Sequence, residues 1–246
     1  MDDRDLAFAG ISEQARLLAE QTVSSRELVA ISLDRIERVD PQLNAFKEVF
    51  AEHALAEAAE ADRRLSAGDR HPLLGVPVAI KDELDVTGSV TRHGTEAYER
   101  PAEFDAEHVR RLRRAGAIVI GKTNLPELAI TGFTESEFNG DTVNPWDVTR
   151  TPGGSSGGSG AAVAAGLVGA ASASDGAGSI RIPAANCGLF GLKPQRGRIS
   201  LMPESQHWYG MSKSGCLTRR VLDTALWLDV ASGPAPGDAH TPSPPS

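Results

Sequence analysis

A lysine that could act as a base closes an apolar run in the first half of the chain. Lys81 follows GVPVAI, residues 75–80, which has the apolar and β-branched composition of a buried strand. A buried lysine becomes a base when burial lowers its pKa, and α/β proteins place ligands at the carboxyl ends of strands. Taken alone, Lys81 is more simply interpreted as an ion-pair partner of Asp82 or Asp85.

A glycine-rich segment further along the chain carries candidate nucleophilic serines. GGSSG, residues 153–157, fits the pattern G-x-S-x-G of a nucleophile elbow. That turn follows a strand, whereas the preceding residues NPWDVTRTP are typical of a loop. A Ser-His mechanism also needs a downstream acid and histidine, and His207 is the one candidate before the Pro-rich C-terminal segment. These features weaken a Ser-His mechanism without removing it.

Phosphate binding and metal chemistry are both disfavoured. GAIVIGKT, residues 116–123, matches the phosphate-binding pattern G-x-x-x-x-G-K-[ST], but its intervening residues form an apolar run. A phosphate loop needs free backbone N–H groups there, so we predict a strand that ends at Gly121. The six histidines have no metal-ligand spacing, and Cys187 and Cys216 are interpreted as small core residues. We therefore predict no metal and no cofactor.

The composition narrows the class of protein. The 246 residues include 25 Lys+Arg and 33 Asp+Glu, a net charge of −8, and 40% are hydrophobic. Such a chain can build a core, while its acidic balance disfavours binding to nucleic acid or to an anionic membrane. The N-terminus has no signal-peptide pattern, and no apolar run reaches the roughly 18 residues of a membrane span. With two cysteines, a cytoplasmic protein is expected.

The elements that must position these residues alternate between helix and strand. Helices are expected in residues 1–70, one of them capped by Ser24 and another at 51–67. Short apolar runs at 76–80 and 117–120 predict buried strands. Strand–helix–strand alternation of this kind favours an α/β layer architecture.

Three further features concern packing. Between the two strands, Asp105 is expected to cap a helix that buries Val109. A helix over 221–230 is expected to bury Leu222 and the apolar residues that follow it at helical spacing. Small residues dominate for more than thirty positions after Gly153, which predicts closely packed backbone rather than a flexible linker.

Several stretches in the same order resemble the amidase signature family of serine hydrolases. These are GVPVAIKD, RRLRRAGAIVIGKTNLPELA, NPWDVTRTPGGSSGGS, SDGAGSIRIPA and CGLFGLKPQRGRIS, and the similarity runs from about the first helix to Val230. A pattern of this length is far more specific than a five-letter elbow. The resemblance implies an α/β fold in which helices flank a mixed β-sheet on both faces.

The resemblance also implies catalytic roles. Lys81 matches the family's catalytic lysine, Ser155 its bridging serine and Ser179 its nucleophile, with a cis peptide bond between Gly154 and Ser155. Neutral Lys81 would accept a proton relayed through Ser155 from Ser179, which would attack an amide carbonyl. The implied reaction is hydrolysis of a small-molecule carboxamide through an acyl-enzyme.

The turn that carries the nucleophile would supply the oxyanion hole. Its donors are the backbone N–H groups of Gly176, Ala177 and Gly178, together with that of Ser179. Ala177 stands where the family usually has glycine. If this position needs a positive φ, alanine costs about 1 kcal/mol there.

Three more residues are expected to support the site. Ser156 is expected to help hold Lys81. Asp175 and Arg181 are expected to fix the turn by hydrogen bonding. Their predicted roles are therefore structural.

The resemblance has consequences for domain organisation. Family members are substantially longer, so we expect one truncated domain over 1–232, followed by a disordered Pro-rich tail at 233–246. The absent part would complete the sheet and one pocket wall, so a missing C-terminal half or a second copy of the chain is an expected partner. Two alternatives remain open. One is a glutaminase-type component of a tRNA-dependent amidotransferase, and the other is a non-catalytic remnant or interaction protein.

Overall fold

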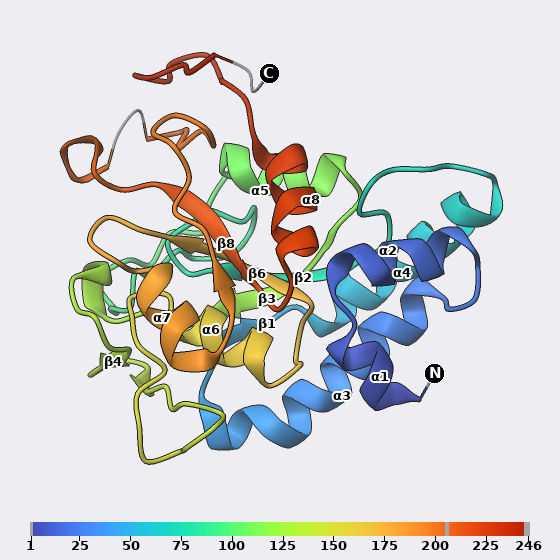
Figure 1. Ribbon diagram of the computed structural model, residues 1–246, viewed down its shortest axis with the longest axis horizontal. Helices are drawn as coiled ribbons and strands as arrows, with labels where there is room; N and C mark the ends of the chain where they lie inside the picture. Colours follow the sequence, from blue (N-terminus) through green and yellow to red (C-terminus); the bar gives the residue numbers. More distant parts are fainter. Residues whose placement is uncertain (1, 205–206, 244–246) are drawn as a thin grey trace.

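A mixed six-stranded β-sheet forms the centre of the protein (Figure 1). The structure is a computed structural model that describes residues 2–204 and 207–243. In sheet order, the strands are β1 (Phe46–Val49), β3 (Ile118–Thr123), β2 (Pro77–Lys81), β6 (Ala170–Ser174), β8 (Ser214–Thr218) and β7 (Phe190–Gly191). Strand β2 runs parallel to both β3 and β6, and the other neighbouring pairs are antiparallel. A separate hairpin joins β4 (Glu135–Ser136) to β5 (Gly140–Asp141).

Helices cover both faces of this sheet, as the resemblance implies. In chain order they are α1 (Asp3–Phe8), α2 (Ile11–Ala19), α3 (Ser25–Leu43), α4 (Ala51–Ser66), α5 (Glu107–Arg114), α6 (Gly157–Ala164), α7 (Arg181–Cys187) and α8 (Val221–Ala231). Helices α6 and α7 lie on one side, α5 and α8 lie on the other, and α1 to α4 gather beside one end (Figure 1). Short 3₁₀ turns at Glu127–Ala129 and Trp208–Gly210 complete the described elements.

The two predicted strands form the buried centre of the sheet. Strand β2 is buried at every position, and so is β3, which extends through the GKT of the phosphate-loop-like pattern. Continuous apolar runs are typical of strands covered on both faces, which explains why neither run alternates with polar residues. The predicted cap at Ser24 is also confirmed, because its Oγ accepts a hydrogen bond from the N–H of Glu27 at 3.1 Å.

Two details of the helix predictions are wrong. Asp105 does not cap α5, because its carboxylate accepts hydrogen bonds from Thr87 and pairs with Arg113. Leu222 does not face inward on α8, since it is 67% exposed while Trp227 is fully buried. The buried face of α8 includes Asp223, whose carboxylate accepts hydrogen bonds from the N–H and hydroxyl of Ser12 at the start of α2. A polar group thus occupies a position that apolar periodicity could not indicate.

The small-residue segment folds into α6 and β6, with backbone packed closely against backbone. Helix α6 is buried along its first seven residues, and the N–H of Gly158 donates to the carbonyl of Asn124 at 3.1 Å. A Cβ atom at Gly158 would lie 2.5 Å from backbone atoms of Asn124. The predicted close approach is therefore confirmed at this position.

Arg219 joins the N-terminus to the middle of the chain. Its guanidinium donates to the carbonyls of Ala7, Phe8, Ala9, Val163 and Val168. Burial lowers its pKa to about 10. The end of α1 is thereby tied to α6 and to the start of β6.

The described part of the Pro-rich tail contacts the body of the protein. Asp238 accepts a hydrogen bond from the hydroxyl of Ser200 at 2.7 Å and another from the N–H of Ala235. Residues 244–246 lie outside the described residues, and disorder of the tail stays a prediction. Cys187 and Cys216 are both buried and free, as expected of small core residues. No described helix is both long and apolar enough to span a bilayer.

Candidate active site

Lys81 is fully buried at the carboxyl end of β2, where its amino group has three acceptors. The Nζ atom lies 2.8 Å from Ser155 Oγ, 2.9 Å from Ser174 Oγ and 3.1 Å from a carboxylate oxygen of Glu83. Burial lowers the pKa of Lys81, and the carboxylates of Glu83 and Asp175 oppose that effect. Lys81 has no ion pair with Asp82 or Asp85 among the described residues, so the simpler interpretation from sequence named the wrong partners.

Strand β6 holds the backbone of Lys81. Its N–H donates to the hydroxyl of Ser172 at 2.8 Å, next to the single ladder pair of β2 and β6, Ala79 with Ala171. The carbonyl of Ser172 in turn accepts from Ser159 on α6 at 2.8 Å. A serine side chain therefore continues the pairing of two strands where their backbones separate.

Ser155 lies directly before α6 and faces Lys81. A cis peptide bond joins Gly154 to Ser155, as the resemblance implies. The segment before α6 is loop rather than strand, and the hydroxyl of Ser155 contacts a lysine instead of a histidine. The nucleophile-elbow interpretation of GGSSG therefore has no support from the geometry.

Ser156 makes its contacts with the backbone of β6. Its hydroxyl donates to the carbonyl of Ser174 at 3.4 Å and accepts from the N–H of Ser174 at 3.3 Å. It has no contact with Lys81 among the described hydrogen bonds, although Ser174 itself accepts from Lys81. Any support that Ser156 gives to Lys81 passes through Ser174.

Ser179 and Ser155 open onto one cavity. The cavity is also lined by Gly176, Ala177 and Glu83. The described residues provide no hydrogen-bond partner for the Ser179 hydroxyl, which is half-buried. The three residues that the resemblance assigns to catalysis are therefore brought to one place, with Lys81 behind Ser155 and Ser179 beside the open space.

Asp175 organises the turn that carries Ser179. Its carboxylate accepts from the N–H groups of Gly178 (2.8 Å), Ile180 (3.3 Å) and Arg181 (3.4 Å), and from the Arg181 guanidinium at 2.9 Å. Burial raises the pKa of Asp175, but hydrogen bonds from Arg181 and Lys193 outweigh it and lower the value to about 2. This is the arrangement that a turn-fixing role requires.

The backbone donors of this turn are not equivalent. The N–H of Gly178 already donates to Asp175, whereas those of Gly176, Ala177 and Ser179 have no acceptor among the described residues. Gly178 has a φ of +139°, which favours glycine, but Ala177 has no positive φ. Alanine at position 177 therefore carries no backbone strain of the kind considered above.

Three polar residues of the site were missed in the sequence. Ser172 and Ser174 are two positions apart on β6, so their side chains lie on the same face and both reach Lys81. Glu83 follows Lys81 by two residues. The alternation in ASAS, residues 171–174, is a signal that could have found the two serines once the strand was recognised.

A second buried lysine, Lys122, is the penultimate residue of the phosphate-loop-like pattern. Its amino group lies 2.7 Å from Asp82 and 2.9 Å from Thr91 Oγ1, and both Lys122 and Asp82 are fully buried. The carbonyl of Val90 is its third acceptor at 3.4 Å. The pattern that resembles a phosphate loop therefore forms a buried strand and an internal ion pair.

A model of the amidase family matches residues 27–246, and two curated relatives agree with it. A Mycobacterium tuberculosis protein described as "Putative amidase AmiB2" is 56% identical over 94% of this chain and 50% of its own length. A glutamyl-tRNA(Gln) amidotransferase component of Chromohalobacter salexigens is 44% identical over 91% of this chain and 46% of its own length. The chain thus spans about half the length of these relatives.

Solved structures show the same fold. The peptide amidase of Stenotrophomonas maltophilia is 36% identical with a TM-score of 0.87, over 96% of this chain and 51% of its own. A 6-aminohexanoate cyclic dimer hydrolase is 38% identical with a TM-score of 0.89, over 98% of this chain and 50% of its own. The mixed sheet with helices on both faces therefore defines an α/β protein with the amidase signature fold. This chain belongs to the amidase family.

Proposed function

We propose that this chain carries the catalytic centre of an amidase, which hydrolyses a carboxamide to a carboxylate and an amine or ammonia. The observation that carries the proposal is the buried contact of 2.8 Å between Lys81 Nζ and Ser155 Oγ, beside the cavity that Ser155 and Ser179 share. A lysine without access to water becomes neutral more readily than an exposed one, which is what a general base requires.

In the first half of the proposed reaction, Ser179 forms an acyl-enzyme. Its Oγ attacks the amide carbonyl carbon, while its proton passes to Ser155 and the proton of Ser155 passes to Lys81 Nζ. The carbon–nitrogen bond then breaks. The proton returns along the same path to the leaving nitrogen, so the products are a free amine and an ester on Ser179.

Water completes the reaction by attacking the ester. Its proton follows the relay to Lys81 and is then returned to Ser179 Oγ, which releases the carboxylic acid. Negative charge develops on the carbonyl oxygen in both halves. The N–H groups of Gly176, Ala177 and Ser179 are the donors we propose for it, while that of Gly178 holds the turn through Asp175.

Labelling with a fluorophosphonate tests whether Ser179 is an activated nucleophile. We expect covalent labelling of the intact chain and its loss in Ser179→Ala. Ser212→Ala is the matched control, because Ser212 lines the same cavity and should leave labelling unchanged. A folded chain that resists the probe would contradict the proposal and favour a non-catalytic remnant.

A second candidate function is release of ammonia from glutamine for a partner protein. It is supported by the 44% identity to the amidotransferase component. The identity to the mycobacterial protein described as an amidase is higher, at 56%, so amide hydrolysis stays the first candidate. Probe labelling would be the same for both functions. Ammonia release that is confined to glutamine would select the second, and hydrolysis of simple carboxamides would select the first.

A further inference from the structure

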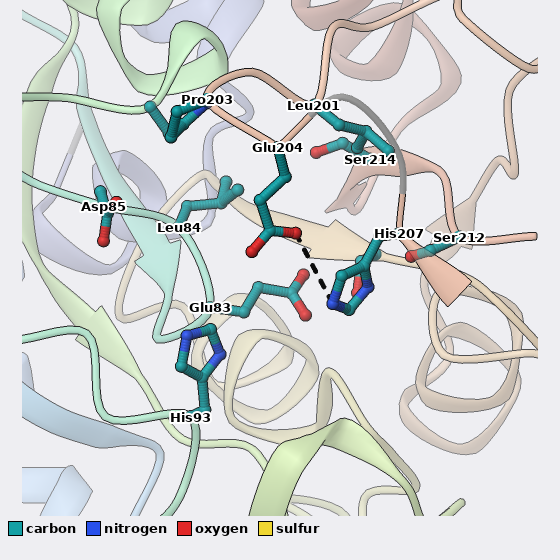
Figure 2. A pocket seen from close by; sticks show the side chains of 12 residues that line it. Glu83, Leu84, Asp85, His93, Leu201, Pro203, Glu204, His207, Ser212 and Ser214 are labelled. Atoms are coloured by element: carbon teal, nitrogen blue, oxygen red, sulfur yellow. Dashed lines mark ion pairs between the residues drawn. The ribbon is translucent and has the colours of Figure 1, made fainter. Parts of the chain in front are cut away.

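Glu83 lies at the boundary between the cavity of Ser179 and a neighbouring cavity. Glu83, Ser174, His207 and Ser212 line both spaces. In Figure 2 the carboxylate of Glu83 points toward the centre of the neighbouring cavity, opposite His207. The side chain of Glu83 is 12% exposed, and that of Lys81 is 0% exposed. Glu83 is thus a charged partner of Lys81 that also borders open space.

The contacts around Lys81 Nζ account for every proton of an ammonium group. An ammonium has three N–H donors, and Ser155, Ser174 and Glu83 supply one acceptor each. A neutral amine keeps two donors and gains a lone pair, which needs a donor in return. The hydroxyl of Ser155 can reverse and donate to that lone pair, whereas the carboxylate of Glu83 can only accept.

The two states of Lys81 therefore differ in their attraction to Glu83. Ionised Glu83 attracts the ammonium by charge but attracts the neutral amine only by a hydrogen bond. Burial raises the pKa of Glu83, but Lys81 and the hydroxyl of Ser174 outweigh it and keep the carboxyl ionised. The same carboxylate opposes the lowering of the Lys81 pKa by burial.

We propose that Glu83 is a positioning residue that holds the amino group of Lys81 and sets the pH at which Lys81 becomes neutral. The inference deepens the proposed function, and its consequence for catalysis rests on that function. Glu83 makes deprotonation of Lys81 harder in the resting site. It also stabilises the ammonium that forms when Ser179 attacks.

The other titratable groups near this pair lie on separate elements. Asp175, at the end of β6, adds a weaker attraction to Lys81. His207 lies near Glu83 and pairs with Glu204 at 3.7 Å (Figure 2). Burial lowers the pKa of His108 on α5 to about 4, so this histidine is neutral near pH 7. Asp85 and His93 line the neighbouring cavity without contacting Lys81.

The charge of Lys81 can be measured directly, without any substrate. The chain has five lysines, so NMR of a chain labelled with ¹³C at lysine Cε gives few signals, and Lys81→Arg identifies that of Lys81. We expect the titration midpoint of Lys81 to fall by about one pH unit or more in Glu83→Gln, because an adjacent opposite charge is lost. Glu83→Asp keeps the charge on a shorter side chain, so its Lys81 midpoint should lie between those of the wild-type chain and Glu83→Gln. It replaces Glu83→Gln as the test variant if Glu83→Gln does not fold.

Asp85→Asn is the matched control, since Asp85 is a carboxylate of the same cavity that accepts from Thr91. It should leave the Lys81 signal unchanged. The inference is overturned if the titration midpoint of Lys81 is the same in the wild-type chain and in both Glu83 variants. It is also overturned if Lys81 keeps one charge across the whole pH range in all three proteins.

Probe labelling as a function of pH separates this inference from the proposed function. If both hold, the acid limb of Ser179 labelling moves to lower pH in Glu83→Gln by the shift seen in the NMR titration. A shifted Lys81 signal without labelling in any variant would contradict the amidase proposal while supporting the control of Lys81 by Glu83.

Discussion

Lys81 and Lys122 lie at the ends of neighbouring parallel strands and are both fully buried. The register pairs Lys81 with Thr123 and Ile80 with Lys122, so the two lysine side chains leave the sheet on opposite faces. Burial lowers the pKa of both, and each has a carboxylate and two further acceptors. Neither burial nor charge pairing therefore distinguishes a base from a structural cation.

The difference lies in what the hydroxyl acceptors face. Each lysine contacts a hydroxyl that can turn and donate to a neutral amine, Ser155 for Lys81 and Thr91 for Lys122. Ser155 shares its pocket with a second serine, Ser179, whereas among the described residues no serine or cysteine lines the pocket beside Thr91. A hydroxyl partner that faces a candidate nucleophile is thus the feature that distinguishes Lys81 as the candidate base.

The largest expected effect is the loss of reaction in Lys81→Arg. A guanidinium keeps its proton at any accessible pH, so it cannot accept one from Ser155. We expect the rate of probe labelling or amide hydrolysis to fall about a thousandfold. Lys47→Arg, at a lysine outside the site, is the control. Retained activity in Lys81→Arg would remove Lys81 from the mechanism.

Lys122 should matter for stability instead of reaction. Lys122→Met leaves the carboxylate of Asp82 buried without its cation, which costs about 3–5 kcal/mol of unfolding free energy. Urea denaturation measures the loss, and adding Asp82→Asn should recover part of it. A loss well below 1 kcal/mol would show that the pair does not hold the two strands together.

The pH dependence of the reaction should follow Lys81 alone. Its neutral form is the base, and burial places its pKa below the ordinary 10.5. The rate should therefore rise with pH to a plateau, and fall about tenfold for each pH unit below the pKa. Lys122→Met should leave the position of this limb unchanged. A rate that decreases as pH rises through neutrality would contradict a neutral lysine.

The smallest expected effect concerns Ser172, which supports Lys81 through its backbone. Ser172→Ala removes the acceptor of the Lys81 N–H, which costs about 1 kcal/mol of unfolding free energy. Ser66→Ala, at an exposed serine whose hydroxyl donates to the carbonyl of Asp62, should cost less than about 0.5 kcal/mol. Equal losses in urea denaturation would mean that Ser172 has no special part in joining β2 to β6.

The sequence predicted the elements whose signal is local. The apolar runs of β2 and β3 and the cap at Ser24 follow from residues close in the chain, whereas the helices on both faces of the sheet were implied by the resemblance. Lys81, Ser155 and Ser179 were named because the resemblance covers each motif, and the structure places them around one cavity. Their catalytic roles stay predictions until the labelling is done.

The errors and omissions have long-range causes. Asp105 looked like a helix cap, but Thr87 and Arg113 use its carboxylate. Ser172 acquires its role only because β6 pairs with β2, 91 residues away. Glu83 is near Lys81 in sequence, yet its carboxylate borders a cavity opposite His207, which is distant in the chain. These contacts form only in the folded protein, so no periodicity of the sequence indicates which residues the three side chains will contact.

Arg219 has a practical consequence for anyone who trims this protein. The family match begins at residue 27, which suggests a shorter chain for expression. Such a chain would lose the carbonyls of Ala7, Phe8 and Ala9, which accept three of the five hydrogen bonds that the Arg219 guanidinium donates. Residues 7–9 are therefore tied to the folded body, and an affinity tag belongs ahead of them.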